Sequence, residues 1–302
     1  MTTQHSTAPM RTAVTVVGLG PMGLALAETL LKQGHPMTVW NRTPEKADGL
    51  VAQGARRAAT VADAVAASPV TVVCLKDYEA LYETLDSASA VLAGRALVNL
   101  SSGTPTEAHA AVAWAREREA DYLDGAIMVP PPAVGHPDSV FLYSGLREVF
   151  DAHRSTLATM GGPTYLGPDP SLAVLYNTAL LDFMYASLNG FLHAAALVGT
   201  ANVEVAKFAE LAIGWFLPAV VGATVLAQAP RLDQGDYPGD QGTMEMNLNA
   251  LEHIARTSLE RNVSSDQPKL MKELAERAIA EGHGGQNYLA VFELLKKPTP
   301  SS

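Results

Sequence analysis

The feature that most constrains this chain is a glycine-rich turn between a buried strand and a helix, close to the N-terminus. Residues 13–20 read AVTVVGLG, a run of branched apolar side chains ending in glycines, which predicts a buried strand. The next residues, PMGLALAETLLKQG, have helical periodicity and end in a glycine. Gly18, Gly20 and Gly23 lie at the junction in the spacing GxGxxG. In a strand–turn–helix context this spacing predicts a dinucleotide-binding loop rather than an ordinary turn.

A loop of this kind uses each of its glycines differently. Gly18 permits the tight turn, Gly20 lets a pyrophosphate approach the backbone, and Gly23 lets the helix pack on the strand. The cofactor-binding residues that the motif predicts are Gly18, Leu19, Gly20, Pro21, Met22 and Gly23.

Strand and helix patterns alternate along the first half of the chain. Apolar runs at 36–42, 70–75 and 95–103 are each followed by a helical pattern, and two more strands are expected at 121–129 and 138–145. Parallel strands joined by helices need cover on both faces, so this order predicts a parallel sheet between two helical layers. The last two strands, which flank a proline-rich loop, are expected near an edge of the sheet.

The second half of the chain has a different pattern. From residue 171 onward almost every segment has helical periodicity, with breaks expected at glycines and prolines that include Pro218. The sequence therefore predicts a disordered tail at 1–11, an α/β Rossmann domain at 12–168 and an all-α domain at 169–302.

The end of the second strand indicates which dinucleotide binds. Enzymes that use NAD usually place Asp or Glu there, to accept hydrogen bonds from the ribose hydroxyls, and a carboxylate would repel a 2′-phosphate. This chain has Asn41, Arg42 and Thr43 instead. Arg42 offers a planar fork suited to phosphate, and Lys46 adds a charge one helical turn later. The sequence predicts NADPH as the cofactor in preference to NADH.

Two later strand ends complete the predicted cofactor site. Cys74 and Leu75 end one strand, and Asn99, Ser101 and Ser102 lie at the end of the next. The carboxyl ends of parallel strands meet at one edge of the sheet, where ligands bind. The serines are expected to hold the nicotinamide ribose, although Ser102 or the nearby threonine equally suits a helix cap. Cys74 has no evident histidine partner and is expected to be a small core residue rather than a nucleophile.

Composition excludes several classes of protein. The net charge of −10 disfavours binding to nucleic acid or to anionic membranes, because no basic stripe faces the phosphates. A single cysteine excludes an internal disulfide framework and fits a reducing cytoplasm. The apolar run at 183–203 is long enough to span a membrane, but Asn189, His193 and Asn202 within it favour a buried helix of a soluble protein. No metal site is predicted.

The segment LYNTALLDFMYASLNGF, residues 175–191, places polar side chains in the most apolar part of the chain. On a helix Asn177 and Tyr185 differ by about 80° and about 12 Å along the axis, so they can flank one cleft. Asp182 lies about 140° from Asn177, nearly on the opposite face. We expect Asp182 to be a buried structural carboxylate, with a role as the catalytic acid as the alternative. A helix of some thirty nearly uncharged residues would span roughly 45 Å and needs more apolar cover than one small domain supplies.

Several motifs together resemble a known family. GLGPMG, NRT and VNLSSGTP resemble the β-hydroxyacid dehydrogenase superfamily. ADYLDGAIMVPPPAVGHPDSVFLYSG, LYNTALLDFMYASLNGFLHAAALV and EGHGGQNYLAVFELLKK look like imine reductases and reductive aminases, so that the resemblance runs from about Ala13 to Lys297. It implies a Rossmann domain joined by a long inter-domain helix to an all-α domain. It also implies an intertwined homodimer whose active sites are shared between subunits.

The resemblance also implies roles for individual residues. Asn177 occupies a position where the family carries Asp or Tyr, Tyr185 matches a family tyrosine, and Asn99 matches a position beside the nicotinamide. Asn177 is a departure, since an amide cannot act as a carboxylic acid and can only donate or accept hydrogen bonds. The residues matched to the substrate side are Met128, Val129, Pro130, Trp215, Met244, Met246 and Asn247.

The absence of one lysine distinguishes between carbonyl reduction and imine reduction on this fold. The hydroxyacid dehydrogenases of the superfamily use a lysine near the start of the long helix, whereas this chain has no lysine between Lys76 and Lys207. Carbonyl reduction needs a donor for the developing alkoxide, while an iminium ion already carries its proton. The sequence therefore predicts an NADPH-dependent imine reductase. A β-hydroxyacid dehydrogenase with an unusual acid and a non-catalytic NADP-binding scaffold or sensor stay open as alternatives.

Overall fold

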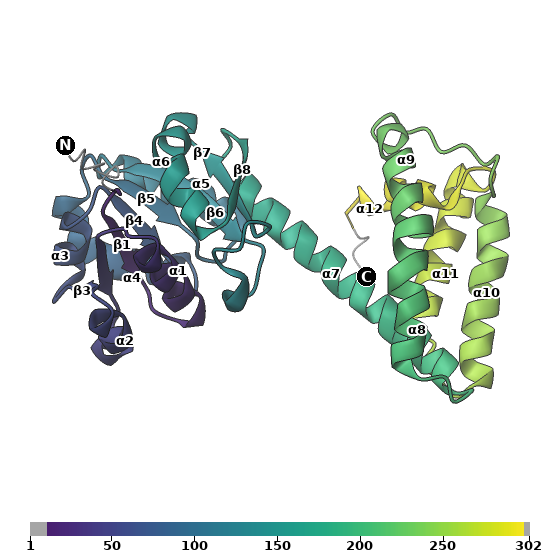
Figure 1. The fold of residues 1–302 in the computed structure, drawn as a ribbon. Helices are drawn as coiled ribbons and strands as arrows, with labels where there is room; N and C mark the ends of the chain where they lie inside the picture. The colour runs from purple at the N-terminus through teal and green to yellow at the C-terminus, as the bar shows by residue number, and fades with distance from the viewer. Residues whose placement is uncertain (1–10, 299–302) are drawn as a thin grey trace, which may run out of the picture. The chain divides into compact units, whose positions relative to one another are not determined.

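The computed structural model describes residues 11–298, and the chain divides into two compact units, Met1–Asp182 and Phe183–Ser302 (Figure 1). The division falls inside a helix, later than the boundary expected at residues 168 and 169. The predicted tail at 1–11 lies, apart from its last residue, outside the described residues.

The first unit is built on one eight-stranded sheet in the order β3-β2-β1-β4-β5-β6-β7-β8. The pairs from β3 to β6 are parallel, β7 is antiparallel to β6, and β8 is parallel to β7. Their bounds are β1 Val14–Val17, β2 Met37–Trp40, β3 Arg56–Arg57, β4 Val70–Val73, β5 Ala96–Asn99, β6 Asp121–Ile127, β7 Val140–Gly145 and β8 Gly162–Gly167.

Helices cover both faces of this sheet, as the alternating pattern predicts (Figure 1). One face packs against α1 (Pro21–Lys32) and α6 (Arg147–Met160), and the other against α3 (Val61–Ala66), α4 (Tyr78–Leu85) and α5 (Pro105–Arg116). Short elements complete the unit: η1 Pro44–Ala47, α2 Asp48–Ala52, η2 Asp86–Val91 and η3 Pro131–Ala133. Strands β1, β4 and β5 are buried along their whole length, because branched apolar side chains point into both layers.

The structure adds a strand at each edge of the sheet that the pattern of apolar runs did not reveal. β3 has only two residues, both exposed, so no apolar run marks it. β8 reads GPTYLG and is mostly half-buried, because only one neighbour covers it. β7 is therefore an inner strand, and the true edge on that side is β8.

The second unit is helical. Helix α7 (Leu172–Gly199) runs across the division between the units, and α8 (Val205–Leu211), η4 (Ala212–Gly222) and α9 (Ala223–Leu232) follow one another without a break. The remaining elements are α10 Met244–Glu260, α11 Asp266–Ala278, η5 Ile279–His283, η6 Tyr288–Val291 and α12 Phe292–Leu295. Their shared core lies between α10, α11, η6 and α12.

Pro218 does not end a helix, contrary to the expectation from the sequence. A proline in an α-helix removes one hydrogen bond and clashes with the carbonyl four residues earlier. Here it lies within η4, whose wider turns bond residues five apart, and the Ala223 N–H donates to the Pro218 carbonyl. The wider turns keep the 28-residue helix Val205–Leu232 continuous.

Apolar side chains of this helix and of α7 are exposed on the single chain. Phe183, Leu192 and Leu226 are 66%, 60% and 79% exposed, where the sequence predicted a buried helix at 183–203. The segment Val205–Leu232 has a mean hydropathy of 1.7 over its most apolar window and none of that window is buried. By length and composition alone it is the one described helix that could cross a membrane.

Candidate active site

At the glycine turn after β1, the backbone of the turn lies in close contact with the backbone of the turn after β4. Gly18 has φ +97°, and a Cβ built on it would lie 2.3 Å from the carbonyl oxygen of Cys74 in the turn after β4. A Cβ on Gly23 would lie 1.9 Å from the Gly18 carbonyl oxygen. A Cβ on Gly20 would meet no protein atom within 4 Å. The chain's own packing therefore requires the first and third glycines, while the second leaves open space above the loop.

Helix α1 begins at this turn with its first amides uncovered. Gly20 is the N-cap residue, no side chain caps the helix, and Pro21 occupies the first position. The N–H groups of the first helical turn have no partner inside the helix and carry its positive end. Open space above Gly20 and uncapped amides beside it suit the pyrophosphate of a dinucleotide.

A cleft of about 450 Å³ opens over this turn, and we call it the dinucleotide cleft. Its lining includes Arg42 and Lys46, neither of which forms an ion pair with another residue in the part of the chain that the structure describes. Glu83 is its one carboxylate. The positive charges of Arg42 and Lys46 fit the 2′-phosphate of NADPH. The full lining is Gly18, Leu19, Gly20, Pro21, Met22, Gly23, Trp40, Asn41, Arg42, Thr43, Lys46, Cys74, Leu75, Lys76, Ala80, Glu83 and Thr84.

Asn41 supports the cleft rather than projecting freely into it. Its Oδ1 accepts a hydrogen bond of 2.9 Å from the Leu19 N–H, and its Nδ2 donates one of 3.0 Å to the Thr43 carbonyl. The amide thereby ties the glycine turn to the end of β2. Arg42 and Thr43 follow directly, so this tie positions the residues predicted to hold the 2′-phosphate.

A second cleft of about 260 Å³, the strand-end cleft, shares Met22, Cys74 and Leu75 with the first. Both open at the carboxyl edge of the sheet, where the predicted cofactor residues of β4 and β5 meet. The strand-end cleft is lined by Met22, Cys74, Leu75, Leu100, Ser101, Ser102, Gly103, Gly125, Ala126, Ile127, Val174 and Asn177. None of these side chains carries a formal charge.

The serines after β5 have distinct roles. Ser101 accepts a hydrogen bond from the Leu75 N–H through its Oγ, at 3.2 Å. The cap of α5 is Thr104, which forms a capping box with Glu107, so the alternative of Ser102 as a helix cap does not apply. Ser102 is left to line the strand-end cleft.

Asn177 is brought to the strand-end cleft by the first turns of α7. Ser144 of β7 fixes the start of this helix, since its Oγ accepts from the Ala173 N–H at 2.9 Å and donates to the Pro170 carbonyl at 2.8 Å. Val174 and Asn177, three residues apart, then face the same cleft. Asn177 is half-buried there.

The other polar residues of this helix are exposed on the single chain. Asp182 is exposed on the single chain and forms no ion pair with a described residue, so its burial stays a prediction. Tyr185 belongs to the second unit, and 61% of its surface is exposed. His193 bonds the Ser264 carbonyl at 3.1 Å, as expected for a histidine with structural partners.

The residues matched to the substrate side lie in both units. Met128 and Val129 are half-buried and Pro130 is exposed, directly after Ile127, which lines the strand-end cleft. In the second unit Trp215 and Met246 are 56% and 66% exposed, and Asn247 is half-buried and donates to the Thr243 carbonyl at 2.9 Å.

Met244 departs from the expectation. Its side chain is fully buried in the core of the second unit, so it contacts no substrate in this conformation. It shares the buried face of α10 with Leu251, Ala255 and Ser258, at helical spacing. The resemblance placed the segment near the substrate, but the helical register decides which of its side chains face outward.

Asn99 lies behind the lining of the strand-end cleft. It is fully buried and lines neither cleft, and its Oδ1 accepts a hydrogen bond of 3.0 Å from the Ser101 N–H. The structure therefore places it beneath the wall that was expected to hold the nicotinamide. Cys74 lines both clefts, but burial raises the pKa of its thiol to about 11, so the thiol stays protonated at neutral pH, as expected for a residue that is not a nucleophile.

A buried carboxyl group below this wall was not identified from the sequence. Asp124 of β6 is fully buried, and its Oδ2 accepts hydrogen bonds from the hydroxyls of Tyr78, at 2.7 Å, and Tyr122, at 2.9 Å. Burial raises the pKa of Asp124 to about 7, against the lowering effect of these hydroxyls and of Asn99. One aspartate within an apolar strand gives no sequence signal that distinguishes this group from a surface residue.

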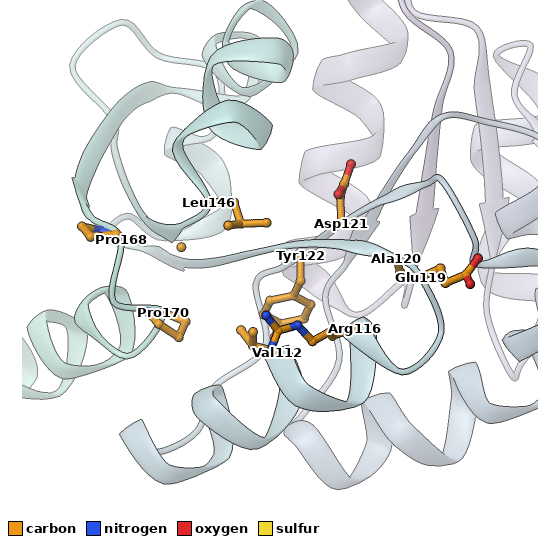
Figure 2. Close-up of a pocket in the computed structure, with 10 residues that line it drawn as sticks. Val112, Arg116, Glu119, Ala120, Asp121, Tyr122, Leu146, Pro168 and Pro170 are labelled. Carbon is orange, nitrogen blue, oxygen red and sulfur yellow. The ribbon is translucent and has the colours of Figure 1, made fainter.

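A separate cleft of about 390 Å³ lies at the opposite edge of the sheet. Asp121 begins β6 there, and Gly145 ends the antiparallel β7. Figure 2 shows the Tyr122 side chain of this cleft beside Val112 and Arg116 of α5. The cleft has no glycine turn and no carboxyl strand end of the parallel sheet, so it lacks the features that position a dinucleotide.

Known proteins match the chain over nearly its whole length. The NAD binding domain of 6-phosphogluconate dehydrogenase matches residues 13–167, and the C-terminal domain of NADPH-dependent reductive aminase-like proteins matches residues 169–297. The NADPH-dependent reductive aminase of Aspergillus oryzae is 37% identical over 93% of this chain and 96% of its own length.

Solved structures give the same match. An imine reductase from Bacillus cereus BAG3X2 is 38% identical, with a TM-score of 0.89 over 95% of this chain and 100% of its own. A reductive aminase from Aspergillus terreus, in complex with NADPH4, cyclohexanone and allyl amine, is 42% identical, with a TM-score of 0.85 over 94% of this chain and 99% of its own.

The raised pKa of Asp124 predicts how stability depends on pH. Between about pH 4 and 7 the folded state holds a proton that the unfolded state has released, so this stabilisation is complete below about pH 4 and is lost as the pH rises through about 7. From pH 5 to pH 8 the loss is on the order of 2–3 kcal/mol, at about 1.4 kcal/mol per pH unit. Asp124→Asn removes this dependence. Urea unfolding at both pH values measures it.

The control is Tyr143→Phe, which removes a buried hydroxyl without a hydrogen-bond partner in the described chain. Its free energy of unfolding should follow that of the wild type at both pH values. Equal pH dependence in the wild type and Asp124→Asn would show that Asp124 titrates normally.

Proposed function

This chain belongs to the family of NADPH-dependent reductive aminases and imine reductases, and from that premise we propose that it reduces the C=N bond of imines and iminium ions to amines. NADPH is its cofactor and, when bound, supplies the hydride that reaches the imine carbon. Cyclic imines are the proposed substrates. Reductive amination of ketones is a second proposed reaction, because a relative was solved with cyclohexanone and allyl amine.

The observation that carries this proposal is the neutral lining of the strand-end cleft. No lysine, histidine, aspartate or glutamate lines it, and Asn177 is the polar side chain that α7 contributes. Reduction of a carbonyl creates an oxyanion, which needs a proton donor or a cation beside it. Reduction of an iminium ion would leave its positive charge on the oxidised cofactor and would create no oxyanion. A neutral cleft beside the cofactor residues therefore suits an iminium better than a hydroxyacid.

We assign roles to the residues of α7 on the same chemical grounds. The Asn177 amide can donate to or accept from the reacting nitrogen, or a water bound to it, and so orients the substrate. Tyr185 is the proposed donor or orienter, since its hydroxyl can do both. Asp182 is proposed to act outside the reacting centre.

The exposed apolar surface of the second unit supports a homodimer. Monomeric proteins rarely expose large contiguous apolar surfaces, and those that do usually bind a partner there. The exposed apolar side chains of the second unit are concentrated on α7 and on the helix Val205–Leu232, and they include Phe183, Met184, Leu188, Leu192, Val205, Leu211, Ile213, Trp215, Phe216, Leu217, Val220, Val221, Val225 and Leu226. We propose that a second copy of the chain covers them and contributes to the active site.

A second copy fits this surface better than a membrane does. Lys207 and Glu210 lie within the helix Val205–Leu232, and charged residues are costly inside a bilayer. Phe191 of α7 stacks on Phe208 at 5.8 Å between ring centres, so the helix is held by protein on one side. Obligate homodimer interfaces are large and hydrophobic, as the uncovered side of this helix is.

The proposed activity has a direct assay. NADPH consumption should be rapid with a cyclic imine, slower with cyclohexanone plus allyl amine, and absent with a hydroxyacid and semialdehyde pair.

Tyr185→Phe should lower kcat by about a hundredfold, as removal of a general acid or its equivalent does. Asp182→Asn should change kcat by less than about threefold, as expected of a residue outside the transition state. If Asp182→Asn abolished turnover while Tyr185→Phe left kcat unchanged, the roles assigned to the two residues would be reversed. If the wild type oxidised hydroxyacids and reduced no imine, the proposed function would be wrong.

Cofactor preference should depend on Arg42. Arg42→Ala removes a charge-assisted bond to the 2′-phosphate, which contributes about 1.5–3 kcal/mol, so the KM for NADPH should rise by at least about tenfold. The KM for NADH should stay nearly constant, because NADH has no 2′-phosphate. The control is Arg56→Ala, an exposed arginine of β3 that does not line the dinucleotide cleft. Equal effects of Arg42→Ala on both cofactors would exclude a 2′-phosphate contact.

The proposed dimer should depend on the exposed apolar helix. The wild type should sediment at twice the mass of the chain, and Leu226→Glu should shift it toward monomer, because a charge would be buried in the interface. Leu146→Glu, at an exposed leucine of the first unit, is the control and should remain dimeric. A monomeric wild type at micromolar concentration, or a protein that requires detergent and sediments with membranes, would contradict the proposal.

A further inference from the structure

The buried carboxyl of Asp124 lies directly under the strand-end cleft. In the parallel pair β5–β6, Asp124 is in register with Asn99, and the residues that follow it, Gly125, Ala126 and Ile127, line the cleft. Asp124 itself is fully buried. The carboxyl is therefore separated from the cleft by the wall and does not contact a ligand there.

Two atoms of this region lack partners and are complementary to each other. Asp124 Oδ1 and Asn99 Nδ2 are both buried and have no hydrogen-bond partner among the described residues. One is an acceptor and the other a donor, on facing residues of neighbouring strands. The Asn99 amide also lowers the pKa of Asp124, which requires the two groups to be close. An unpaired buried polar group costs about 1–3 kcal/mol, so closing this pair is strongly favoured.

The carboxylate form matches the groups around it. Tyr78 and Tyr122 donate to Oδ2, and the unpaired Asn99 Nδ2 on the facing strand is a further donor. A protonated carboxyl would present its own hydrogen to one of these donors. If Oδ1 carries the hydrogen, Asn99 has to turn its own Oδ1 away from the Ser101 N–H to accept it. If Oδ2 carries it, the hydroxyl of Tyr78 or Tyr122 has to turn from donor to acceptor. Protonation of the carboxyl therefore disturbs either the bond from Ser101 to Asn99 or a bond from one of the tyrosines.

From Asn99 the hydrogen bonds continue to the wall of the cleft. Asn99 Oδ1 holds the Ser101 N–H at 3.0 Å, and Ser101 Oγ holds the Leu75 N–H at 3.2 Å. Tyr78 supports the same wall by packing, because a Cβ on Gly103 would lie 2.3 Å from its ring. Leu75, Ser101 and Gly103 all line the strand-end cleft.

Every group that faces the carboxyl is neutral at physiological pH. The titratable neighbours are Tyr78 and Tyr122, with Tyr82 of α4 farther off and Glu107 of α5 acting on that tyrosine. The partner in β7 is Ser144, whose hydroxyl is used at the start of α7. No lysine, arginine or histidine among the described residues compensates the charge of Asp124.

We propose that Asp124 is a positioning residue whose carboxylate, acting through Asn99 and Tyr78, holds the wall of Leu75, Ser101 and Gly103 in the form that binds the nicotinamide end of NADPH. The proposal rests on the proposed function for the identity of the cofactor but not for imine reduction. Since burial raises the pKa of Asp124 to about 7, the wall should be held at and above neutral pH and released below it.

The test is the affinity for NADPH as a function of pH, measured by titration calorimetry on the full-length protein. For the wild type the Kd should rise as the pH falls from 8 to 6, by up to about tenfold per pH unit below the pKa of a single coupled group. Binding at pH 7 should release a proton, detected as a dependence of the heat on the buffer. Asp124→Asn, which cannot titrate, should lose both effects.

Two further variants separate positioning from a purely structural role. Tyr78→Phe removes a donor to the carboxylate, so it should move the inflection of the Kd to higher pH. Tyr143→Phe removes an unpartnered buried hydroxyl and should leave the inflection where it is. The cofactor's own phosphate titrates near pH 6, with about the pKa of a phosphate ester, and contributes equally to all variants.

The outcomes are decisive either way. An unchanged pH dependence in Asp124→Asn, or equal inflections in Tyr78→Phe and Tyr143→Phe, would overturn the proposal. If Asp124→Asn does not fold, the shift in the pH inflection of the NADPH Kd in Tyr78→Phe tests the proposal by itself. A wild type that binds NADPH with this pH dependence but reduces no imine would contradict the proposed function and leave the role of Asp124 intact.

Discussion

The rest of the structure depends on a contact between backbones at the turn after β1. Gly18 approaches the Cys74 carbonyl, and Gly23 approaches the Gly18 carbonyl, more closely than any side chain would allow. These two contacts hold the start of α1 against β1 and β4, so the uncapped amides of α1 face the carboxyl edge of the sheet. The position of the dinucleotide cleft, and through shared residues that of the strand-end cleft, follows from this contact.

Much of the fold and of the cofactor site could be predicted because they rest on local patterns. The GxGxxG spacing, the strand end at Arg42 and the serines after β5 each follow a buried strand, and parallel strands bring their ends together. The edge strands β3 and β8 could not be predicted, because strands covered on one side carry no continuous apolar run. Pro218 was a misleading signal, because the wider turns of η4 accommodate it.

Motif position does not show whether a site residue is buried. Asn99 and Met244 were assigned by motif position, and the structure buries both, because burial depends on the strand or helix face on which a residue lies. Asp124 was missed for the converse reason, since a buried polar residue looks like any other aspartate in the sequence. Its partners come from β5 and α4, which are distant in the chain and become neighbours only in the folded sheet. Networks of this kind require tertiary structure to be recognised.

Charge is distributed along the two clefts in a way that matches the chemistry assigned to each end. Arg42 and Lys46 place positive charge where we propose that the 2′-phosphate binds, and the first turn of α1 adds its dipole at the proposed pyrophosphate position. The strand-end cleft, where the reacting nitrogen would lie, has no charged side chain. A lysine there would repel an iminium ion. The carboxyl of Asp124 lies behind the wall, where it can orient backbone amides through Asn99 without contacting the substrate. The charges that would bind the cofactor are thus separated from the proposed reacting centre, which has no cation to stabilise the oxyanion of a carbonyl reduction.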